Sequence, residues 1–292
     1  MAGTFSDSWK LTKTSFRLIA EDRALLVFPV VGGISIVGVF ALFLVGALLL
    51  LPNALSGGTA SQPFVLLAVV LFVAVYFVTT FISVYCTAAL IGAATLKLNG
   101  QQPTAADGWR VARARLPRLL VWSMVSATLG LVIQIIASRV RGIAGVLIAG
   151  IGGAAWSVAT YFMVPILVYE DQGAWASLKR SAHLFVSTFG RSLVTNLVLG
   201  LIVGAGIFAA VVLGIIGLFA FAGGSAVLGL VLIVVAVLVA VVVGLIGATA
   251  EGVLRAALYR YATTGKIDPD LLPQAYRAYG PASGGSPLSY LE

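Results

Sequence analysis

Long apolar runs that contain no charged residue constrain this chain more than any other feature. The clearest run extends from Ser192 to Phe221. Backbone amides in lipid must be satisfied within their own segment, so a run of this length predicts a helix that crosses a membrane. Five further runs have the same character. The six predicted spans lie at about 24–51, 64–96, 119–137, 143–168, 193–222 and 226–250.

The composition agrees with a membrane protein. Hydrophobic residues make up 60% of the chain and charged residues only 10%, whereas soluble domains carry roughly 25% charged residues. For these 292 residues we expect one integral membrane domain, at 1–265, and a flexible cytoplasmic tail at 266–292. The single cysteine, Cys86, lies inside the second predicted span and cannot form an intrachain disulfide.

Each predicted pair of spans follows a basic amphipathic segment, at about 4–22, 104–118 and 173–191. Apolar residues in these segments recur every three or four positions, as in a helix that lies on a membrane surface. The predicted fold class is all-α: a polytopic membrane protein with six transmembrane helices in three hairpins, each preceded by a cytoplasmic amphipathic surface helix. The apolar face of the third segment is predicted to consist of Trp175, Leu178, Ala182, Phe185 and Phe189.

A tryptophan opens each of the three segments, and a cation follows it four residues later. This spacing places both side chains on one helical face, where they can anchor the helix at a membrane surface. Two interpretations stay open, a true internal repeat and the common use of Trp and Lys beside membranes. The candidates for contact with lipid headgroups are Trp9, Lys10, Lys13, Arg17, Trp109, Arg110, Arg113, Trp175, Lys179 and Arg180.

The distribution of cations predicts the orientation. With six spans, Arg139 and Arg141 fall on one side and the other 16 of the 18 Lys and Arg residues fall on the opposite side. The positive-inside rule then places both termini in the cytoplasm, in a multi-pass protein of the cell (plasma or inner) membrane. The expected partner of these cations is anionic lipid rather than nucleic acid. A homo-oligomer or a partner membrane protein is compatible with the same pattern.

Several short motifs occur in a recognisable order along the chain. They are Ser8–Ser15 before Leu25–Pro29, Leu119–Trp122, Val164–Pro165 with Glu170, Leu178–Ser181 before Phe189–Gly190, and Leu258–Ala262 before Gly265. This order resembles an uncharacterised family of six-helix bacterial and archaeal integral membrane proteins, described as a domain of unknown function. The Lys-Arg-Ser segment is also distantly similar to the membrane regions of some glycerophosphodiesterases. The resemblance implies the topology and supplies no catalytic residue.

Catalytic chemistry within the membrane is not expected. An intramembrane protease needs paired aspartates, a serine with a base, or a zinc motif, and the predicted spans contain no Asp, His or Lys. The one histidine, His183, lies on a predicted surface segment. It is either a pH-sensitive lipid contact or a solvated side chain. Glu170, Asp171 and Glu251 are expected to pair with neighbouring cations. We therefore predict no enzymatic activity, cofactor or metal.

Polar residues form stripes along the predicted spans. Either they line a narrow aqueous path, or they pack helices together through small side chains and hydroxyl groups. Packing is the expectation here, with Gly200, Gly204, Ala236, Ala240, Gly244 and Ala248 as further members of such contacts. The stripe residues are Tyr76, Thr80, Ser83 and Thr87, then Ser126 and Gln134, then Ser157, and Asn196.

Two functions follow from these observations. The first is a non-catalytic integral membrane protein that engages lipid as a scaffold or accessory protein through basic helices on the cytoplasmic face. The alternative is a channel or transporter subunit for a small uncharged solute, for which the polar stripes are the support.

Overall fold

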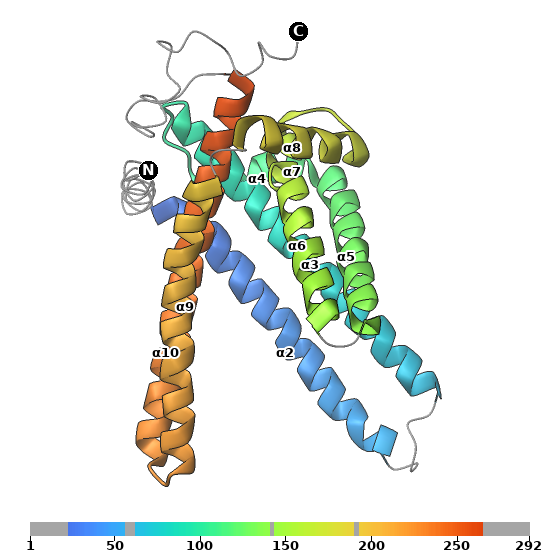
Figure 1. Cartoon of the computed structure of the whole chain (residues 1–292), viewed down its shortest axis with the longest axis vertical. Helices are drawn as coiled ribbons and strands as arrows, with labels where there is room; N and C mark the ends of the chain where they lie inside the picture. The colour runs from blue at the N-terminus through green and yellow to red at the C-terminus, as the bar shows by residue number, and fades with distance from the viewer. Residues whose placement is uncertain (1–22, 56–61, 141–142, 190–192, 265–292) are drawn as a thin grey trace. The chain divides into compact units, whose positions relative to one another are not determined.

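The computed structural model describes residues 23–55, 62–140, 143–189 and 193–264, and these residues are arranged as helices joined by short turns (Figure 1). Six of the described helical segments are long and apolar enough to cross a membrane, as the run lengths predicted. The described part of the chain is therefore all-helical, and its six long apolar helices indicate a multi-pass membrane protein. The predicted surface helix at 4–22, with Trp9, Lys10, Lys13 and Arg17, and the predicted tail at 266–292 lie outside the described residues.

The chain divides into two compact units. One unit, here called the α2–α8 unit, comprises Phe28–Ala93 and Thr104–His183. The other, here called the α9–α10 unit, comprises Met1–Val27, Ala94–Pro103 and Leu184–Glu292. The helices that lie wholly or mostly in the first unit are α2 (Val27–Leu55), α3 (Gln62–Leu98), α4 (Ala105–Ala114), α5 (Leu116–Arg139), α6 (Ile143–Thr160), α7 (Met163–Tyr169) and α8 (Ala174–Phe189).

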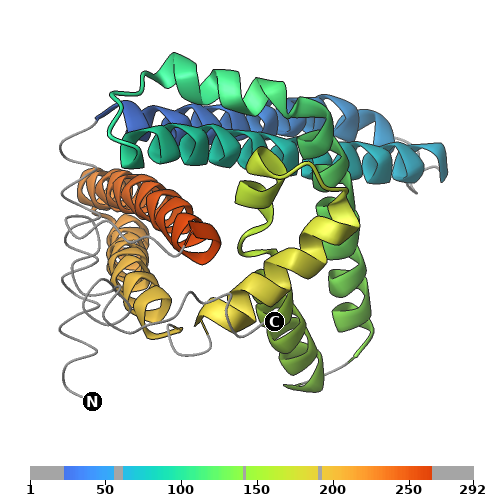
Figure 2. The ribbon, with the colours of Figure 1, turned by 90° about the horizontal axis from the view of Figure 1, so that it is seen from above.

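Glycine allows close contacts within the α2–α8 unit. A Cβ atom added at Gly32 of α2 would lie 3.2 Å from the sulfur of Cys86 in α3. One added at Gly92 of α3 would lie 2.9 Å from the side chain of Val111 in α4. Small residues let helix backbones approach closely, which is a main source of stability where lipid removes the hydrophobic driving force. Helices α2, α3 and α4 run side by side in the view of Figure 2.

Aromatic and glycine contacts join α5 to its neighbours. The rings of Trp122 in α5 and Trp156 in α6 stack with centroids 5.8 Å apart. Gly130 of α5 faces Tyr76 of α3, and an added Cβ atom would lie 2.5 Å from the Tyr76 hydroxyl. Trp122 is buried and Tyr76 half-buried. Offset aromatic stacking adds about 0.5–1.5 kcal/mol to the burial of the rings.

Two prolines explain breaks in the helical path of this unit. The first is Pro117: the chain leaves the helical path just before it, at Arg115, between α4 and α5. The second is Pro165. The predicted span at 143–168 is interrupted at Tyr161 and Phe162, so that α6 ends and the short buried helix α7 begins. A proline ring clashes with the carbonyl four residues earlier, which here belongs to Tyr161.

The α9–α10 unit contains the 3-10 turn η1 (Arg23–Leu26), α9 (Leu193–Ala222) and α10 (Ala226–Thr264). Helices α9 and α10 pack along each other in opposite directions. Gly247 of α10 faces Val203 near the start of α9, and Gly229 of α10 faces Phe221 near its end. The turn between them includes Gly224, whose φ of +92° lies in the region that favours glycine.

Glycine packing was expected in this pair of helices, but several of the positions differ. The closest contacts of α9 with α10 use Gly206, Gly217, Gly229 and Gly247. The predicted members Gly200, Gly204 and Gly244 face open space among the described residues. Ala236 is buried, as predicted. Helical periodicity identifies a line of small residues, but it does not show which line meets the partner helix.

Helix α10 continues well beyond the length needed for a span, at 39 residues. Near its end, Glu251 pairs with Arg255 one turn later, as predicted. Buried Ala250 and Leu254 pack with Leu26 of η1, so the end of α10 is held by the residues that precede α2.

Candidate functional site

Helix α8 presents a tryptophan and a lysine on its outer face. Trp175 is 68% exposed, and the ammonium group of Lys179 lies 5.7 Å from the centre of its ring. His183, two turns after Trp175, is also exposed. An amphipathic aromatic ring beside a cation is the combination found at membrane–water interfaces. Of the three predicted Trp–cation pairs, this is the one whose geometry matches a surface anchor in the described residues.

The inner face of α8 differs from the predicted one. Ser177 and Ser181 are fully buried there, whereas Trp175 was predicted on the apolar face and instead points outward. The Ser181 hydroxyl accepts a hydrogen bond of 3.0 Å from the backbone N–H of Phe162. This N–H lies at the break between α6 and α7. The buried serine therefore ties α8 to the break.

Helix α4 uses its tryptophan differently. The ring of Trp109 lies 5.1 Å from that of Phe28 and 5.5 Å from that of Tyr85, and it is half-buried. The preceding Gly108 is buried, and a Cβ atom added to it would lie 2.6 Å from the carbonyl oxygen of Ala89. Trp109 therefore packs α4 onto α2 and α3 rather than facing outward.

The cations of α4 do face outward. Both Arg110 and Arg113 are exposed, and Arg110 pairs with Asp107 at 3.0 Å. Asp107 also accepts a hydrogen bond of 2.9 Å from the backbone N–H of Thr104, the N-cap of α4. The bonds from Thr104, followed by the nearby charge of Arg110, hold the pKa of Asp107 below its ordinary value. The carboxylate stays ionised and fixes the start of the helix.

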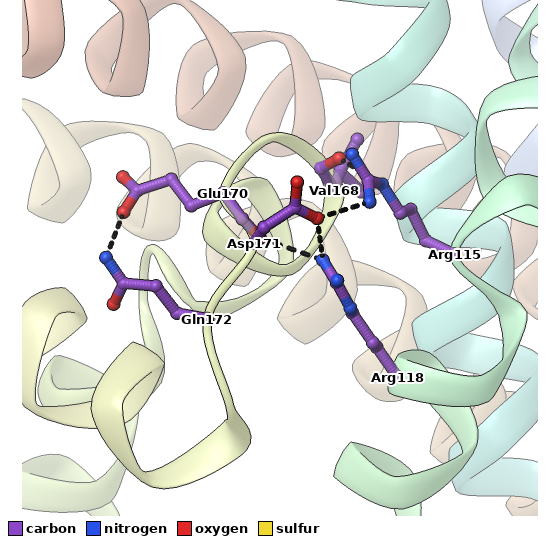
Figure 3. A network of polar contacts seen from close by, with 6 residues as sticks. All are labelled: Arg115, Arg118, Val168, Glu170, Asp171 and Gln172. Atoms are coloured by element: carbon purple, nitrogen blue, oxygen red, sulfur yellow. Dashed lines mark hydrogen bonds and ion pairs between the residues drawn. The ribbon is translucent and has the colours of Figure 1, made fainter.

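A network of ion pairs joins the start of α5 to the link between α7 and α8 (Figure 3). The NH1 atoms of Arg115 and Arg118 lie 2.7 Å and 2.6 Å from the same oxygen, Oδ1, of Asp171. Arg115 also donates to the carbonyl of Val168 at 2.9 Å, and Arg118 to that of Glu170 at 3.1 Å. Asp171 therefore pairs with cations, as predicted for this acid.

The second acid of the link turns toward α8. Arg180 Nε lies 2.5 Å from Oε2 and 2.7 Å from Oε1 of Glu170, and Gln172 donates to Glu170 at 3.0 Å. Arg180, predicted to contact lipid, is therefore engaged with a carboxylate, although its side chain stays partly exposed. Hydrogen bonds from Arg118 and then Arg115, with their charges, hold the pKa of Asp171 below its ordinary value.

The stripe residues are not brought to one interior site. Ser83, Gln134 and Ser157 are exposed on the α2–α8 unit. Thr87 and Ser126 are half-buried. The hydroxyl of Thr80 donates to the carbonyl of Tyr76 in its own helix, at 2.7 Å. The side chain of Asn196 lies outside the described residues.

Other hydroxyls in the spans behave as Thr80 does. Ser123 donates to Leu119 at 2.7 Å, and Thr160 donates to Trp156 at 2.8 Å. Such bonds satisfy a hydroxyl within its own helix and leave less of it for a solute. Within the described residues, no three His, Cys, Asp or Glu side chains gather as a metal site would require.

The positions of the polar groups in the α2–α8 unit share one pattern. The ion-pair network, the outward cations of α4 and the Trp175–Lys179 pair all lie at the end where α5 begins, opposite the turn between α5 and α6 (Figure 1). At the other end, Arg139 closes α5 and is exposed. The ion-pair network, the outward cations of α4 and the Trp175–Lys179 pair thus belong to the same end of this unit.

Comparison with known proteins identifies a family and no described activity. A model for a family of unknown function (DUF6159) matches residues 65–268, which is more than two thirds of the chain. Neither the curated proteins nor the solved structures contain a match.

Proposed function

We propose that this chain, which belongs to the DUF6159 family of unknown function, is a non-catalytic membrane protein that holds anionic lipid at its cytoplasmic face and acts there as a scaffold or accessory protein. The observation that carries the proposal is the outer surface of α4 and α8. This surface is exposed and carries three cations and one aromatic ring, those of Arg110, Arg113, Lys179 and Trp175. The opposite faces of both helices are buried.

The proposed orientation rests on charge. Both α4 and α8 precede spans and belong to the side that holds 16 of the 18 cations in the six-span arrangement, leaving Arg139 and Arg141. Cytoplasmic loops are enriched in Lys and Arg, so this side is assigned to the cytoplasm of a plasma or inner membrane. Anionic lipids of that leaflet attract cations near the surface, at about 1 kcal/mol for each Lys or Arg.

The three-hairpin arrangement with a surface helix before each hairpin is part of the same proposal. The pairing of α9 with α10 and the contacts of α5 with α6 support it. The distant similarity of the Lys-Arg-Ser segment to membrane regions of some glycerophosphodiesterases stays a prediction about the segment and transfers no activity.

Lipid selectivity tests the proposal. The full chain in bilayers would be assayed by electron spin resonance for its preference for spin-labelled phosphatidylglycerol over phosphatidylcholine. Three neutral substitutions, Arg110→Gln, Arg113→Gln and Lys179→Gln, are combined in one variant, and each should reduce that preference several-fold, because each cation contributes on the order of 1 kcal/mol. Arg139→Gln is the matched control, since this exposed cation closes α5 at the opposite end.

The control defines the outcome that opposes the proposal. An equal loss of selectivity in Arg139→Gln would show a nonspecific charge effect. An unchanged selectivity in the triple variant would show that α4 and α8 do not hold anionic lipid.

The channel alternative has weaker support in the geometry. It needs polar side chains that meet around a path, whereas Ser83, Gln134 and Ser157 are exposed on the unit and Thr80 bonds to its own helix.

A further inference from the structure

Two guanidinium groups converge at the start of α5. The NH1 atoms of Arg115 and Arg118 lie within 2.7 Å of one oxygen of Asp171, so two cations face a single carboxylate (Figure 3). The three groups together carry one net positive charge. Planar guanidinium groups recognise phosphate with paired, charge-assisted hydrogen bonds, and two of them match the two negative charges of a phosphate monoester.

The two arginines are held in place by neutral groups as well. Arg115 donates through Nε to the carbonyl of Val168 at 2.9 Å, and Arg118 donates to the carbonyl of Glu170 at 3.1 Å. These bonds do not depend on the carboxylate of Asp171. The guanidinium groups therefore keep their positions if the carboxylate moves away, and a new anion would meet a site whose side chains are already ordered.

Asp171 is the member of the network that can be displaced. Its side chain is 72% exposed, against 30% for Arg115 and 35% for Arg118. It stands in the short link between α7 and α8, outside either helix. The neighbouring Glu170 is only 16% exposed and is bound to Arg180 of α8, so the link stays anchored when Asp171 turns outward.

We propose that Arg115 and Arg118 form a binding site for a phosphate monoester, and that Asp171 occupies this site until the phosphate displaces it. The site lies where α5 begins, at the polar end of the α2–α8 unit. A lipid headgroup such as that of phosphatidic acid carries this chemistry, and so does free phosphate. The inference rests on the proposed function for the presence of anionic lipid at this end. It adds a specific binding site, in which the carboxylate of Asp171 competes with the phosphate.

Binding to the purified full chain in detergent tests the site. The probes are dihexanoyl phosphatidic acid below its micelle concentration, inorganic phosphate, and dihexanoyl phosphatidylcholine as the neutral control. Asp171→Asn should bind a phosphate probe about tenfold more tightly than the natural chain, because it removes a like charge in direct competition at a partly exposed site. Adding Arg115→Gln and Arg118→Gln should abolish the gain.

A second pair of variants separates this site from the surface of α4. In the Asp171→Asn background, Arg110→Gln with Arg113→Gln should keep the tenfold gain, since these arginines face outward elsewhere on α4. The same two substitutions test the proposed function through lipid selectivity, so the two ideas can fail independently. Arg118→Gln alone should weaken phosphate binding in the natural chain, which tests the site even if Asp171→Asn folds poorly.

The probes identify the source of the phosphate. Tighter binding of dihexanoyl phosphatidic acid assigns the site to a lipid headgroup, and equal or tighter binding of inorganic phosphate assigns it to free phosphate. Both results support the site. Two results would overturn it: no gain for either probe in a folded Asp171→Asn variant, or a gain that survives the loss of both arginines.

Discussion

The hydroxyl of Ser181 accepts a hydrogen bond from the backbone N–H of Phe162, 3.0 Å away, at the point where α6 gives way to α7. Both residues are buried. One turn earlier on the same face of α8, Ser177 is equally buried, but its hydroxyl has no hydrogen-bond partner within the described part of the chain. Two serines in similar surroundings thus differ in one bond.

This difference predicts opposite effects of two matched substitutions. Ser181→Ala should lower the stability of the protein by about 0.5–1.5 kcal/mol, because the buried hydrogen bond between Ser181 and the N–H of Phe162 is lost. Ser177→Ala should be neutral or slightly stabilising, since it removes an unsatisfied hydroxyl. Thermal unfolding of both variants in the same detergent measures the contrast. Equal losses would show that the Phe162–Ser181 bond is not what holds the break.

The glycines of α10 provide a second matched pair. A Cβ atom at Gly229 would lie 2.5 Å from the backbone nitrogen of Phe221, which cannot move without shifting α9, whereas Gly244 faces open space among the described residues. Gly229→Ala should therefore destabilise the pairing of α9 with α10, by roughly 1–3 kcal/mol as in overpacked sites. Gly244→Ala should cost nothing or stabilise by about 0.5–1 kcal/mol through helix propensity.

A disulfide crosslink can report this pairing directly. Cysteines at Val203 and Gly247, whose side-chain positions face each other, would be oxidised in a chain with Cys86→Ala. The yield should fall in Gly229→Ala and stay unchanged in Gly244→Ala. A yield that is the same in both variants would contradict the predicted clash.

The ion pairs of Asp171 predict a pH dependence. Arg118 first, and then Arg115, lower the pKa of this carboxyl below its ordinary value of 3.8. A lowered pKa contributes stability that is fully present above the ordinary value and is lost as the pH falls through the lowered one. The stability difference between the natural chain and Asp171→Asn should therefore be constant from about pH 5 to pH 8 and shrink below the ordinary pKa of an aspartate.

Titration of the carboxyl by carbon NMR checks the assignment. Arg118→Gln should raise the pKa of Asp171 toward its ordinary value, while Arg110→Gln should leave it unchanged, because Arg110 pairs with Asp107 instead. If the pKa of Asp171 were unchanged in Arg118→Gln, Arg118 would not be the main cause of the lowered pKa.

The number of spans could be predicted from the sequence because backbone hydrogen bonding in lipid is a local requirement. The direction in which each surface residue points could not. Trp109 and Trp175 stand in the same pattern, yet one packs against Tyr85 and the other is exposed. The difference arises from Gly108, whose missing side chain lets α4 approach α3. That contact is tertiary and has no periodic signal.

The helix break at Phe162 and the ion pairs of Asp171 each had a sequence signal, but residue spacing alone did not reveal them. The break at Phe162 follows from Pro165, because a proline disturbs the helical bond to the residue four positions earlier rather than at its own position. The pairing of Asp171 with a cation was expected from its position at a helix end. Its two partners, Arg115 and Arg118, lie more than fifty residues away in sequence and could be found only from the fold.

Labelling in whole cells tests the proposed orientation. In a chain with Cys86→Ala, a cysteine at Ser56 should react with an impermeant thiol reagent, because the proposed orientation assigns position 56, between the first two spans in the sequence, to the side with few cations. A cysteine at Ala106, on the exposed surface of α4, should react only after the cells are opened. The same behaviour at both positions would exclude the six-span orientation with both termini inside.

Gln134 separates the lipid-holding function from the channel alternative. It carries the one side-chain amide among the stripe residues that the structure describes, and it is exposed on α5. In a pore, Gln134→Leu would make a narrow aqueous path apolar, and the flux of a small uncharged solute such as glycerol into proteoliposomes would be lost while folding stayed intact. In a protein that packs its helices, interhelical polar contacts are worth only about 0.6–2 kcal/mol, and Gln134→Leu should shift thermal stability by no more than that.

We expect the second result, with no glycerol flux above that of empty vesicles for the natural chain. Protein-dependent flux that disappears in Gln134→Leu would instead establish the channel.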